Sequence, residues 1–225
     1  MDRAGCRYER PCEVAREVDA QVKPLSITLP VVQSLSFDQG EILRNIVRLH
    51  CPHGIDADLT YGNGKFYEHL ATPKHCFDIE PLHPHVVKSD SRTTPLTDNS
   101  VRSVMFDPPF ITYIQQGREH NSVMARRFGG YYTYAELEDH YKGTLDEAAR
   151  ILERKGIMVF KCQDIIHNHR MHCTHANVIA WAVEYGFRLR DLFVLAAKHR
   201  MPGPQKGIQR HARIHHSYFL ILELK

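Results

Sequence analysis

A four-residue motif, Asp107-Pro108-Pro109-Phe110, combines a carboxylate, a rigid backbone and an aromatic ring. Two successive prolines stop a strand or a helix and fix the backbone that follows. An amino group on a flat ring could donate hydrogen bonds to the Asp107 carboxylate and the Pro108 carbonyl, while Phe110 stacks on the ring. The motif predicts a site for a planar amine. The alternative is a buried turn with an aspartate at the end of a strand.

A glycine turn, Gly62-Asn63-Gly64, follows the apolar run 54–59. Glycine lets the backbone approach a ligand closely, because no side chain intervenes. A dinucleotide fingerprint would need a third glycine at position 67, where Tyr67 stands, and the sequence has no Gly-Lys-Ser/Thr phosphate loop. We therefore expect a nucleoside ligand without phosphates. The alternative is that the two glycines only make a turn.

Two acidic residues follow the next apolar runs and suit the same kind of ligand. Asp78 ends the run 74–79, where a carboxylate can accept hydrogen bonds from both ribose hydroxyls. Asp90 follows the run 86–89 and could meet an adenine edge. A ligand with ribose and adenine but no phosphates points to S-adenosylmethionine. The residues expected to bind this cofactor are Asp58, Thr60, Gly62, Gly64, Asp78 and Asp90.

The elements that must position these motifs alternate along the chain. Apolar spacing of three and four residues predicts helices over 41–49, 134–154 and 174–185. Short apolar runs bounded by turn residues predict strands over 54–59, 74–79, 86–89, 101–106, 156–161, 187–196 and 217–224. Strands that alternate with helices indicate an α/β fold with parallel pairing through right-handed crossovers. The loop between the last two strands permits them to pair antiparallel.

The domain organisation follows from the same pattern. Residues 1–24 are polar and without a clear period, so we expect a tail or a loosely docked arm. Residues 25–225 contain no repeat and no linker, so we expect one domain. Two loop insertions, 111–133 and 196–216, carry basic and aromatic residues that suit phosphates and bases. The expected substrate-binding residues are Arg118, Arg126, Arg127, Tyr131, Tyr132, Lys198, Arg210, His211 and Arg213.

The two motifs together resemble those of amino-methyltransferases, which transfer methyl groups from S-adenosylmethionine to exocyclic amines of nucleobases. The family pairs Asp-x-x-x-Gly-x-Gly with Asp/Asn/Ser-Pro-Pro-aromatic, and this chain has the first at 58–64 and the second at 107–110. Segments 155–164 and 211–220 are also similar to small phage and bacterial DNA methyltransferases. The resemblance covers about residues 33–225, nearly the whole chain.

The resemblance implies a single-domain, Rossmann-like class I methyltransferase. It implies a seven-stranded, mostly parallel sheet with helices on both faces and an antiparallel last strand. The catalytic residues would be Asp107, Pro108, Pro109 and Phe110, and the substrate would be a base in DNA, adenine before cytosine. The motif ends in Phe110 where tyrosine is commoner, which keeps the stacking face. Many relatives carry a separate target-recognition domain for which this chain has no room, so sequence recognition would rest with the loops.

Composition bounds the other possibilities. The chain has 225 residues, 43% hydrophobic and 24% charged, an ordinary globular mix that excludes a mainly disordered chain or a coiled coil. No apolar run is long enough to cross a membrane, and the N-terminus lacks the apolar region of a secretory signal. The six cysteines are expected to be reduced thiols in a cytoplasmic protein. The net charge of +3 leaves nucleic-acid binding open, and the oligomeric state is not indicated.

Three alternatives stay open beside this interpretation. The histidine-rich stretch 167–175 has the ligand types of a zinc site, but without a Cys-x-x-Cys partner we expect no metal and a solvated loop. In a functional variant of this prediction, the His and Arg side chains of the loop contact phosphate. The chain could act on an RNA base, adenine or guanine, instead of DNA. It could also be a silent subunit that binds nucleic acid without transferring methyl, although Asp107 and both motif glycines are intact.

Overall fold

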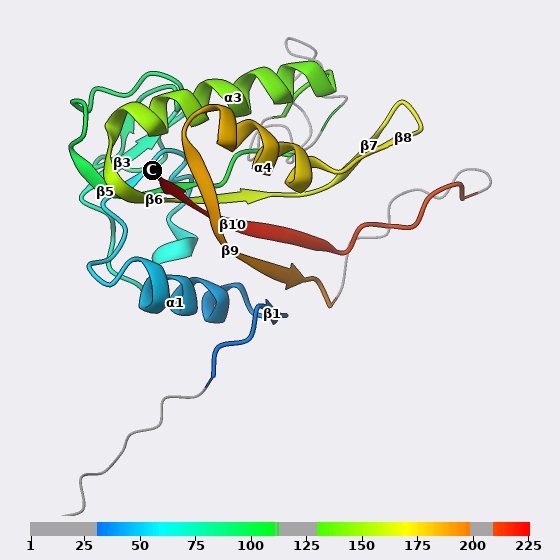
Figure 1. Cartoon of the computed structure of the whole chain (residues 1–225), viewed down its shortest axis with the longest axis horizontal. Coiled ribbons are helices and arrows are strands. Elements are labelled where there is room, and N and C mark those ends of the chain that lie inside the picture. The colour runs from blue at the N-terminus through cyan, green and yellow to red at the C-terminus, as the bar shows by residue number, and fades with distance from the viewer. Residues whose placement is uncertain (1–30, 111, 113–129, 199–208) are drawn as a thin grey trace, which may run out of the picture. The chain divides into compact units, whose positions relative to one another are not determined.

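The computed structural model describes residues 31–110, 112, 130–198 and 209–225 (Figure 1). Residues from Val32 to Lys225 form one compact unit. The predicted tail, 1–24, lies outside the described residues. So do Arg118, Arg126 and Arg127, three of the residues predicted to bind substrate.

An eight-stranded sheet forms the centre of the fold, in the order β1-β9-β10-β6-β5-β2-β3-β4. β10 runs antiparallel to its neighbours β6 and β9, and every other pairing in this sheet is parallel. The prediction of an α/β fold with a mostly parallel sheet is confirmed. The strands are β1 (Leu35–Ser36), β2 (Ala57–Asp58), β3 (His75–Asp78), β4 (Val87–Lys88), β5 (Val101–Phe106), β6 (Leu152–Cys162), β9 (Phe187–Ala196) and β10 (His216–Leu224).

Helices cover both faces of the sheet (Figure 1). Helix α1 (Gln39–His50) lies on one face, and α3 (Tyr134–Ile151) and α4 (Thr174–Glu184) lie on the other. A 3-10 helix, η1 (Lys65–Tyr67), follows the glycine turn.

Successive side chains along β5 point to opposite faces of the sheet and pack in two separate cores, one on each face. Val104 and Phe106 pack in the core that contains α3 and α4, while Met105 packs in the core that contains α1. This alternation is the period of two that a strand buried on both faces requires.

The helix starts are specified locally. The Asp38 carboxylate caps α1 by accepting hydrogen bonds from the Gly40 and Glu41 N–H groups, at 2.7 and 3.2 Å. The Thr133 hydroxyl caps α3 by accepting from the Glu136 N–H at 3.2 Å. The end of α3 differs from the prediction, because the chain turns into β6 at Leu152, which pairs with the start of β5. The apolar spacing predicted a helix that ends at residue 154, three residues beyond the observed end of α3 at Ile151.

Two features of the fold were not predicted. The sheet has an eighth strand, β1, where the resemblance implies seven, and it spans only two residues beside β9. The stretch expected to be a solvated loop contains an antiparallel hairpin of β7 (Ile165–His167) and β8 (Arg170–His172). The hairpin was missed because its strands are short and their polar residues hide the alternation.

Candidate active site

The sheet topology brings the two predicted motifs together. β2 and β5 are parallel neighbours, with Asp58 beside Met105. The glycine turn follows β2 and the Pro-Pro motif follows β5, so both lie at the carboxyl edge of the sheet. This edge is where open α/β sheets bind their ligands.

The glycine turn has a backbone shape that only glycine adopts easily. Gly62 and Gly64 have positive φ angles of 57° and 73°. A Cβ on Gly64 would lie 2.8 Å from the Tyr61 hydroxyl, whereas a Cβ on Gly62 would meet only the Thr60 carbonyl, at 3.9 Å. The Gly62 side of the turn is therefore open, and a side chain there would occupy the space in which a ligand can approach the backbone.

Asp78 fastens the glycine turn to the end of β3. Its Oδ2 accepts a hydrogen bond from the Gly62 N–H at 2.8 Å, and its Oδ1 accepts from the Glu80 N–H at 2.9 Å. Each carboxylate oxygen can accept a further hydrogen bond. The side chain is only partly buried, so it combines a structural role in the turn with remaining capacity for a ligand.

Asp58 lies under the turn and not on its ligand side. It is 2% exposed, and its two oxygens accept hydrogen bonds from the Thr60 N–H at 2.8 Å and the Tyr67 hydroxyl at 2.6 Å. Burial raises the pKa of Asp58 to about 7. Both of its oxygens are engaged within the turn, so its part in cofactor binding would be to hold the loop.

Thr60 connects the two motifs directly. Its Oγ1 accepts a hydrogen bond from the Asp107 N–H at 2.7 Å. This one short hydrogen bond fixes the position of the Pro-Pro motif relative to the glycine turn. A bound cofactor and a bound amine would have to meet between these two motifs.

The Asp107 carboxylate is paired with Lys161, at the end of β6. The Lys161 Nζ donates to Asp107 Oδ2 at 3.2 Å and to the Gln39 Oε1 at 3.1 Å. The same ammonium lies 4.9 Å from the ring centre of Phe66 and 5.5 Å from that of Phe219. Burial raises the pKa of the Asp107 carboxyl, and the neighbouring Lys161 cation opposes that rise.

Sequence reasoning did not assign Lys161 to the site. The sequence feature that could have indicated Lys161 is its position as the one lysine in the apolar run 156–161, close to the carboxyl end of β6. Lysine is almost never fully buried unless it is paired, and Lys161 is 8% exposed. Its partner is 54 residues away in sequence, so only the pairing of β5 with β6 reveals the contact.

The prolines and the aromatic ring complete the motif. Pro108 is buried, while Pro109 and Phe110 are partly exposed. The hydroxyl of Tyr141 on α3 donates to the Pro109 carbonyl at 3.2 Å. This bond anchors the motif to the helix.

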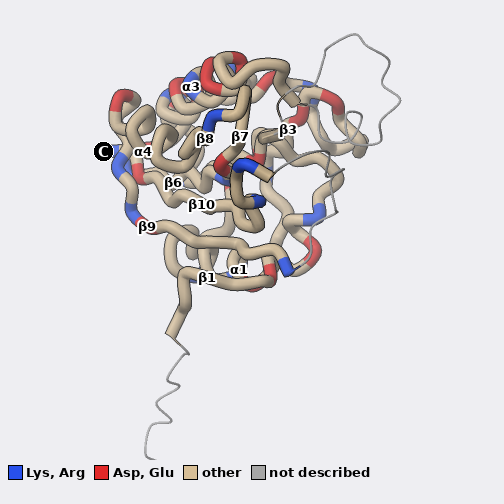
Figure 2. Tube along the Cα trace, turned by 90° about the vertical axis from the view of Figure 1, so that its right-hand side faces the viewer, with Lys and Arg blue, Asp and Glu red and all other residues tan. Residues whose placement is uncertain are grey.

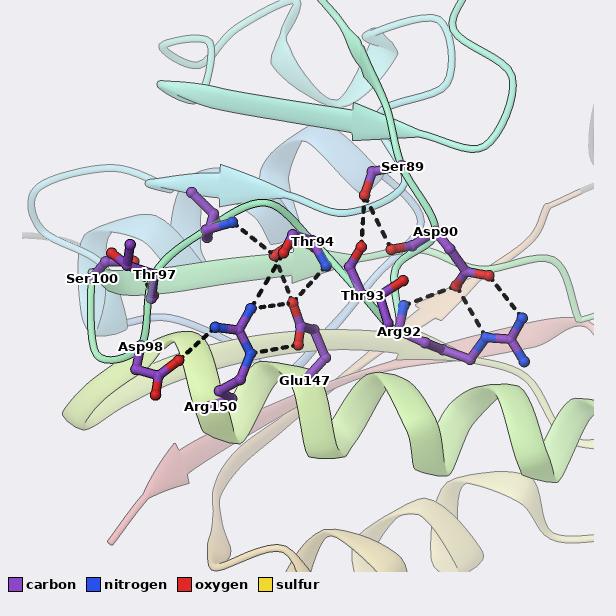
Figure 3. A network of polar contacts seen from close by, with 11 residues as sticks. Ser89, Asp90, Arg92, Thr93, Thr94, Thr97, Asp98, Ser100, Glu147 and Arg150 are labelled. Carbon is purple, nitrogen blue, oxygen red and sulfur yellow. Dashed lines mark hydrogen bonds and ion pairs between the residues drawn. The ribbon is translucent and has the colours of Figure 1, made fainter.

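Asp90 is held by an ion pair in the loop after β4 (Figure 3). Its carboxylate accepts from the Arg92 Nε at 3.0 Å and the Arg92 Nη2 at 2.7 Å. These hydrogen bonds lower the pKa of Asp90 to about 2. A cofactor amine at Asp90 would therefore meet an ionised carboxylate that already has a cationic partner.

The loop that carries Asp90 is tied to α3 farther along (Figure 3). The Thr94 N–H and hydroxyl both donate to Glu147 Oε1 at 2.6 Å. Arg150 then bridges Glu147 and Asp98, at 2.7 and 2.6 Å. This network holds the loop between β4 and β5 against the helix, so that the segment leading into β5 has a fixed path.

Tyr131, which was expected to bind substrate, is buried. It is 7% exposed, its ring packs near Tyr141, and its hydroxyl pairs with the His140 Nδ1. Burial lowers the pKa of His140 to about 4, so the imidazole is neutral at pH 7. Of the two tyrosines expected to bind substrate, Tyr131 is thus packed within the protein, whereas Tyr132 is 46% exposed.

The predicted basic residues that the structure describes lie at the surface. Lys198, Arg210 and Arg213 are exposed, and His211 is partly exposed. Figure 2 shows Lys and Arg positions on the chain just before β10 and near the β7–β8 hairpin. The Lys198 ammonium lies 5.7 Å from the ring centre of Phe37.

The part of the chain that the structure describes has neither a metal-binding cluster nor a membrane-spanning helix. No three of its His, Cys, Asp or Glu side chains are grouped so that they could hold a metal ion, and this includes the histidine-rich stretch. None of its helices has the length and apolar character needed to cross a membrane.

No family model and no curated protein matches this sequence. Solved methyltransferase structures have similar folds. TTHA0409 of Thermus thermophilus, a proposed DNA modification methylase solved with S-adenosyl-L-methionine, is 18% identical over 60% of this chain and 53% of its own, with a TM-score of 0.41. This chain thus spans about half of that relative.

TrmN from Thermus thermophilus is 14% identical over 83% of this chain and 49% of its own, with a TM-score of 0.46. The cytosine-N4-specific PvuII DNA methyltransferase is 14% identical over 57% and 44%, with a TM-score of 0.40. At these identities and TM-scores the likenesses carry no conclusion about cofactor or substrate.

Proposed function

We propose that this protein transfers a methyl group from S-adenosylmethionine to the exocyclic amino group of a nucleobase, with adenine in DNA as the first candidate. The observation that carries the proposal is the hydrogen bond from the Asp107 N–H to Thr60, together with the ion pair between Asp107 and Lys161. These contacts hold an acceptor for an amine directly beside a glycine turn that is open to a nucleoside.

The residues around the glycine turn fit the cofactor. The open side of Gly62 admits a ligand to the backbone. Asp78 can still accept hydrogen bonds, which suits the two ribose hydroxyls, and Asp90 supplies a carboxylate for an adenine edge. When bound, S-adenosylmethionine supplies an activated methyl group on a sulfonium centre.

Asp107 and its motif would orient the amine. The lone pair of a nucleobase amine is delocalised into the ring, so the amine is a poor nucleophile. Hydrogen bonds from its two N–H groups to the Asp107 carboxylate and the Pro108 carbonyl would direct the lone pair toward the methyl group. The carboxylate would also stabilise positive charge that develops on the nitrogen during an in-line displacement. Proton loss can follow transfer, so Asp107 need not act as a strong base beforehand.

A base inside a duplex cannot reach this edge of the sheet. It must be flipped out or already single-stranded, and Phe110 supplies one face on which it can stack. The exposed cations Lys198, Arg210 and Arg213 suit the phosphate backbone next to the flipped base. The preference for adenine and for DNA rests on the resemblance of the Asp-first motif to DNA adenine methyltransferases.

The test is to incubate the protein with S-adenosylmethionine labelled in the methyl group and with either DNA or RNA, and then to identify the modified nucleoside. N6-methyladenine in DNA supports the proposal as stated, and a methylated base in RNA alone changes its substrate. Label in neither, with cofactor binding intact, favours a silent binding subunit.

A variant then tests the site itself. Asp107→Ala should abolish transfer and leave the cofactor affinity, measured by calorimetry, nearly unchanged, because Asp107 would contact the amine and not the cofactor. Asp146→Ala is the matched control, since Asp146 is an exposed carboxylate on α3. An Asp107→Ala protein that retains most of its turnover would remove the Pro-Pro motif from the mechanism.

A further inference from the structure

The β7–β8 hairpin projects from the carboxyl edge of the sheet beyond the ends of the central strands (Figure 1). Its two strands pair antiparallel, with His167 opposite Arg170. The two-residue turn between them, Asn168 and His169, has positive φ angles of 50° and 59°. Two positive φ angles in a two-residue connection are the geometry that matches the twist of a tight hairpin. The tip therefore has a defined shape.

The base of the hairpin is anchored in the core. Ile165 and His167 are buried, at 8% and 7% exposure. The ring of His172 stacks on Tyr134 of α3, with 3.8 Å between ring centres. The Tyr134 hydroxyl accepts a hydrogen bond from the Asn177 side chain on α4 at 2.8 Å. Helix α3 thus holds the hairpin through Tyr134, α4 fixes the position of Tyr134, and the tip of the hairpin reaches solvent.

The exposed tip has the composition of a nucleic-acid contact. Residues 168–171 are all exposed and comprise Asn168, His169, Arg170 and Met171. The stretch 165–175 contains no Asp or Glu, and neither does 209–216.

The hairpin tip and the segment before β10 touch. The His211 Nε2 donates to the carbonyl of His169 at 3.0 Å. Residues 168–171 and 209–213 therefore form one acid-free surface, which we call the hairpin surface. The exposed Arg170, Arg210 and Arg213 give this surface a positive charge.

We propose that the hairpin surface binds duplex DNA, with the tip of the β7–β8 hairpin in the major groove beside the flipped base. The major groove of B-DNA is about 12 Å wide and admits a two-stranded β-ribbon. Arginine can bond to both acceptors on the guanine edge, and asparagine can pair with the adenine edge. Arg170 and Asn168 at the tip are the residues that would read bases, whereas Arg210 and Arg213 would contact phosphates.

The position of the hairpin supports this assignment, which rests on the proposed function. β6 contributes Lys161, which contacts Asp107, and ends at Cys162. The hairpin begins three residues later, at Ile165. One continuous segment therefore joins Lys161, the ion-pair partner of the proposed catalytic carboxylate, to the proposed reading element, so a base sequence in the groove would be recognised at a fixed distance from the target amine.

The test compares Arg170→Ala with Arg154→Ala. Arg154 is also an exposed arginine, but it lies near the opposite end of β6, away from the site. Affinity for a duplex containing the target is measured by fluorescence anisotropy over a range of salt concentrations, and methylated positions are mapped by sequencing. Thermal melting and cofactor affinity show that both variants fold.

Arg170→Ala should weaken duplex binding at least about fivefold and let the protein methylate additional sequences, because a good contact to a base edge discriminates by that factor or more. Arg154→Ala should match the wild type in both measurements. Wild-type affinity and an unchanged set of methylated sites in Arg170→Ala would overturn the inference, and so would a protein that binds single strands but no duplex. If the duplex is bound through Arg170 but no base is methylated, the proposed function fails and the hairpin surface stands.

Discussion

Replacing Lys161 by methionine tests how the Asp107 carboxylate is kept ionised at the edge of the core. Methionine retains most of the length and the apolar contacts of the side chain and removes the ammonium. The Nζ lies 3.2 Å from Asp107 Oδ2, and the side chains of Lys161 and Asp107 are 10% and 26% exposed, so water screens this partly buried pair less than it would a surface pair. In the variant the carboxylate would lose its cationic partner and keep its other surroundings.

The expected effect is on the pH dependence of methyl transfer. Burial already raises the pKa of Asp107, and Lys161 opposes that rise. A cation at this range lowers a carboxyl pKa by about 1–3 units, so its removal should raise the pKa of Asp107 by about the same amount. The other ionisable groups around it, Asp58 and Tyr141, remain in the variant. Only the ionised carboxylate can stabilise the positive charge that develops on the amine nitrogen, so the acid limb of activity should move to higher pH.

The assay is kcat/KM for methyl transfer measured from about pH 5 to about pH 9, because the pH profile of kcat/KM reports the pKa values of essential groups in the free enzyme. Lys161→Arg is the conservative control, since arginine keeps a positive charge near the carboxylate and should restore most of the wild-type profile. Asp107→Asn should remove the limb altogether. Thermal melting checks that each variant is folded.

A purely structural role for Lys161 makes a different prediction. Lys161→Met would then lose activity by the same factor at every pH, and Lys161→Arg would give no selective rescue of the acid limb. Either result would refute the reasoning that the ammonium sets the ionisation of Asp107.

Three further predictions concern the glycine turn and the surface. Asp78→Ala should weaken S-adenosylmethionine binding by about 1–3 kcal/mol, because the ribose hydroxyls and the Gly62 N–H would lose their acceptor, and unchanged affinity by calorimetry would remove Asp78 from the site. The pKa of Asp58 is raised to about 7, so its contribution to stability is present at low pH and is lost as pH rises from about 4 to 7. In denaturant titrations, Asp58→Asn should abolish the loss of stability between about pH 4 and 7. If the free energy of unfolding of Asp58→Asn still fell with pH as in the wild type, the raised pKa would not belong to Asp58. Arg210→Ala with Arg213→Ala should lower the slope of log affinity against log salt by about 0.7–0.9 for each phosphate that is no longer neutralised, with cofactor binding spared. A wild-type slope would mean that neither arginine touches phosphate.

The fold could be predicted where its signals are local. β5 and β9 have the predicted bounds, because an apolar run between turn residues carries its own strand signal. β10 begins one residue earlier than predicted. The two-residue strand β1 carries no such signal and exists because it pairs with β9.

The site could be predicted only in part, for a related reason. The motifs at 58–64 and 107–110 are contiguous in sequence, and the parallel sheet brings them to one edge. Lys161 joins Asp107 only through the pairing of β5 with β6, and the burial of Tyr131 depends on its contact with His140. Such contacts between distant parts of the chain have no local pattern to reveal them.

The antiparallel strand β10 also joins two parts of the sheet that do not pair with each other directly. It is the last strand in sequence, yet it lies between β6 and β9, so those two earlier strands stay unjoined until β10 has inserted. Phe219 on β10 is one of the rings beside the Lys161 ammonium. The ion pair with Asp107 therefore has its full apolar surroundings only when β10 is in place, and a chain that lacked β10 would have both motifs but not the environment that tunes the carboxylate.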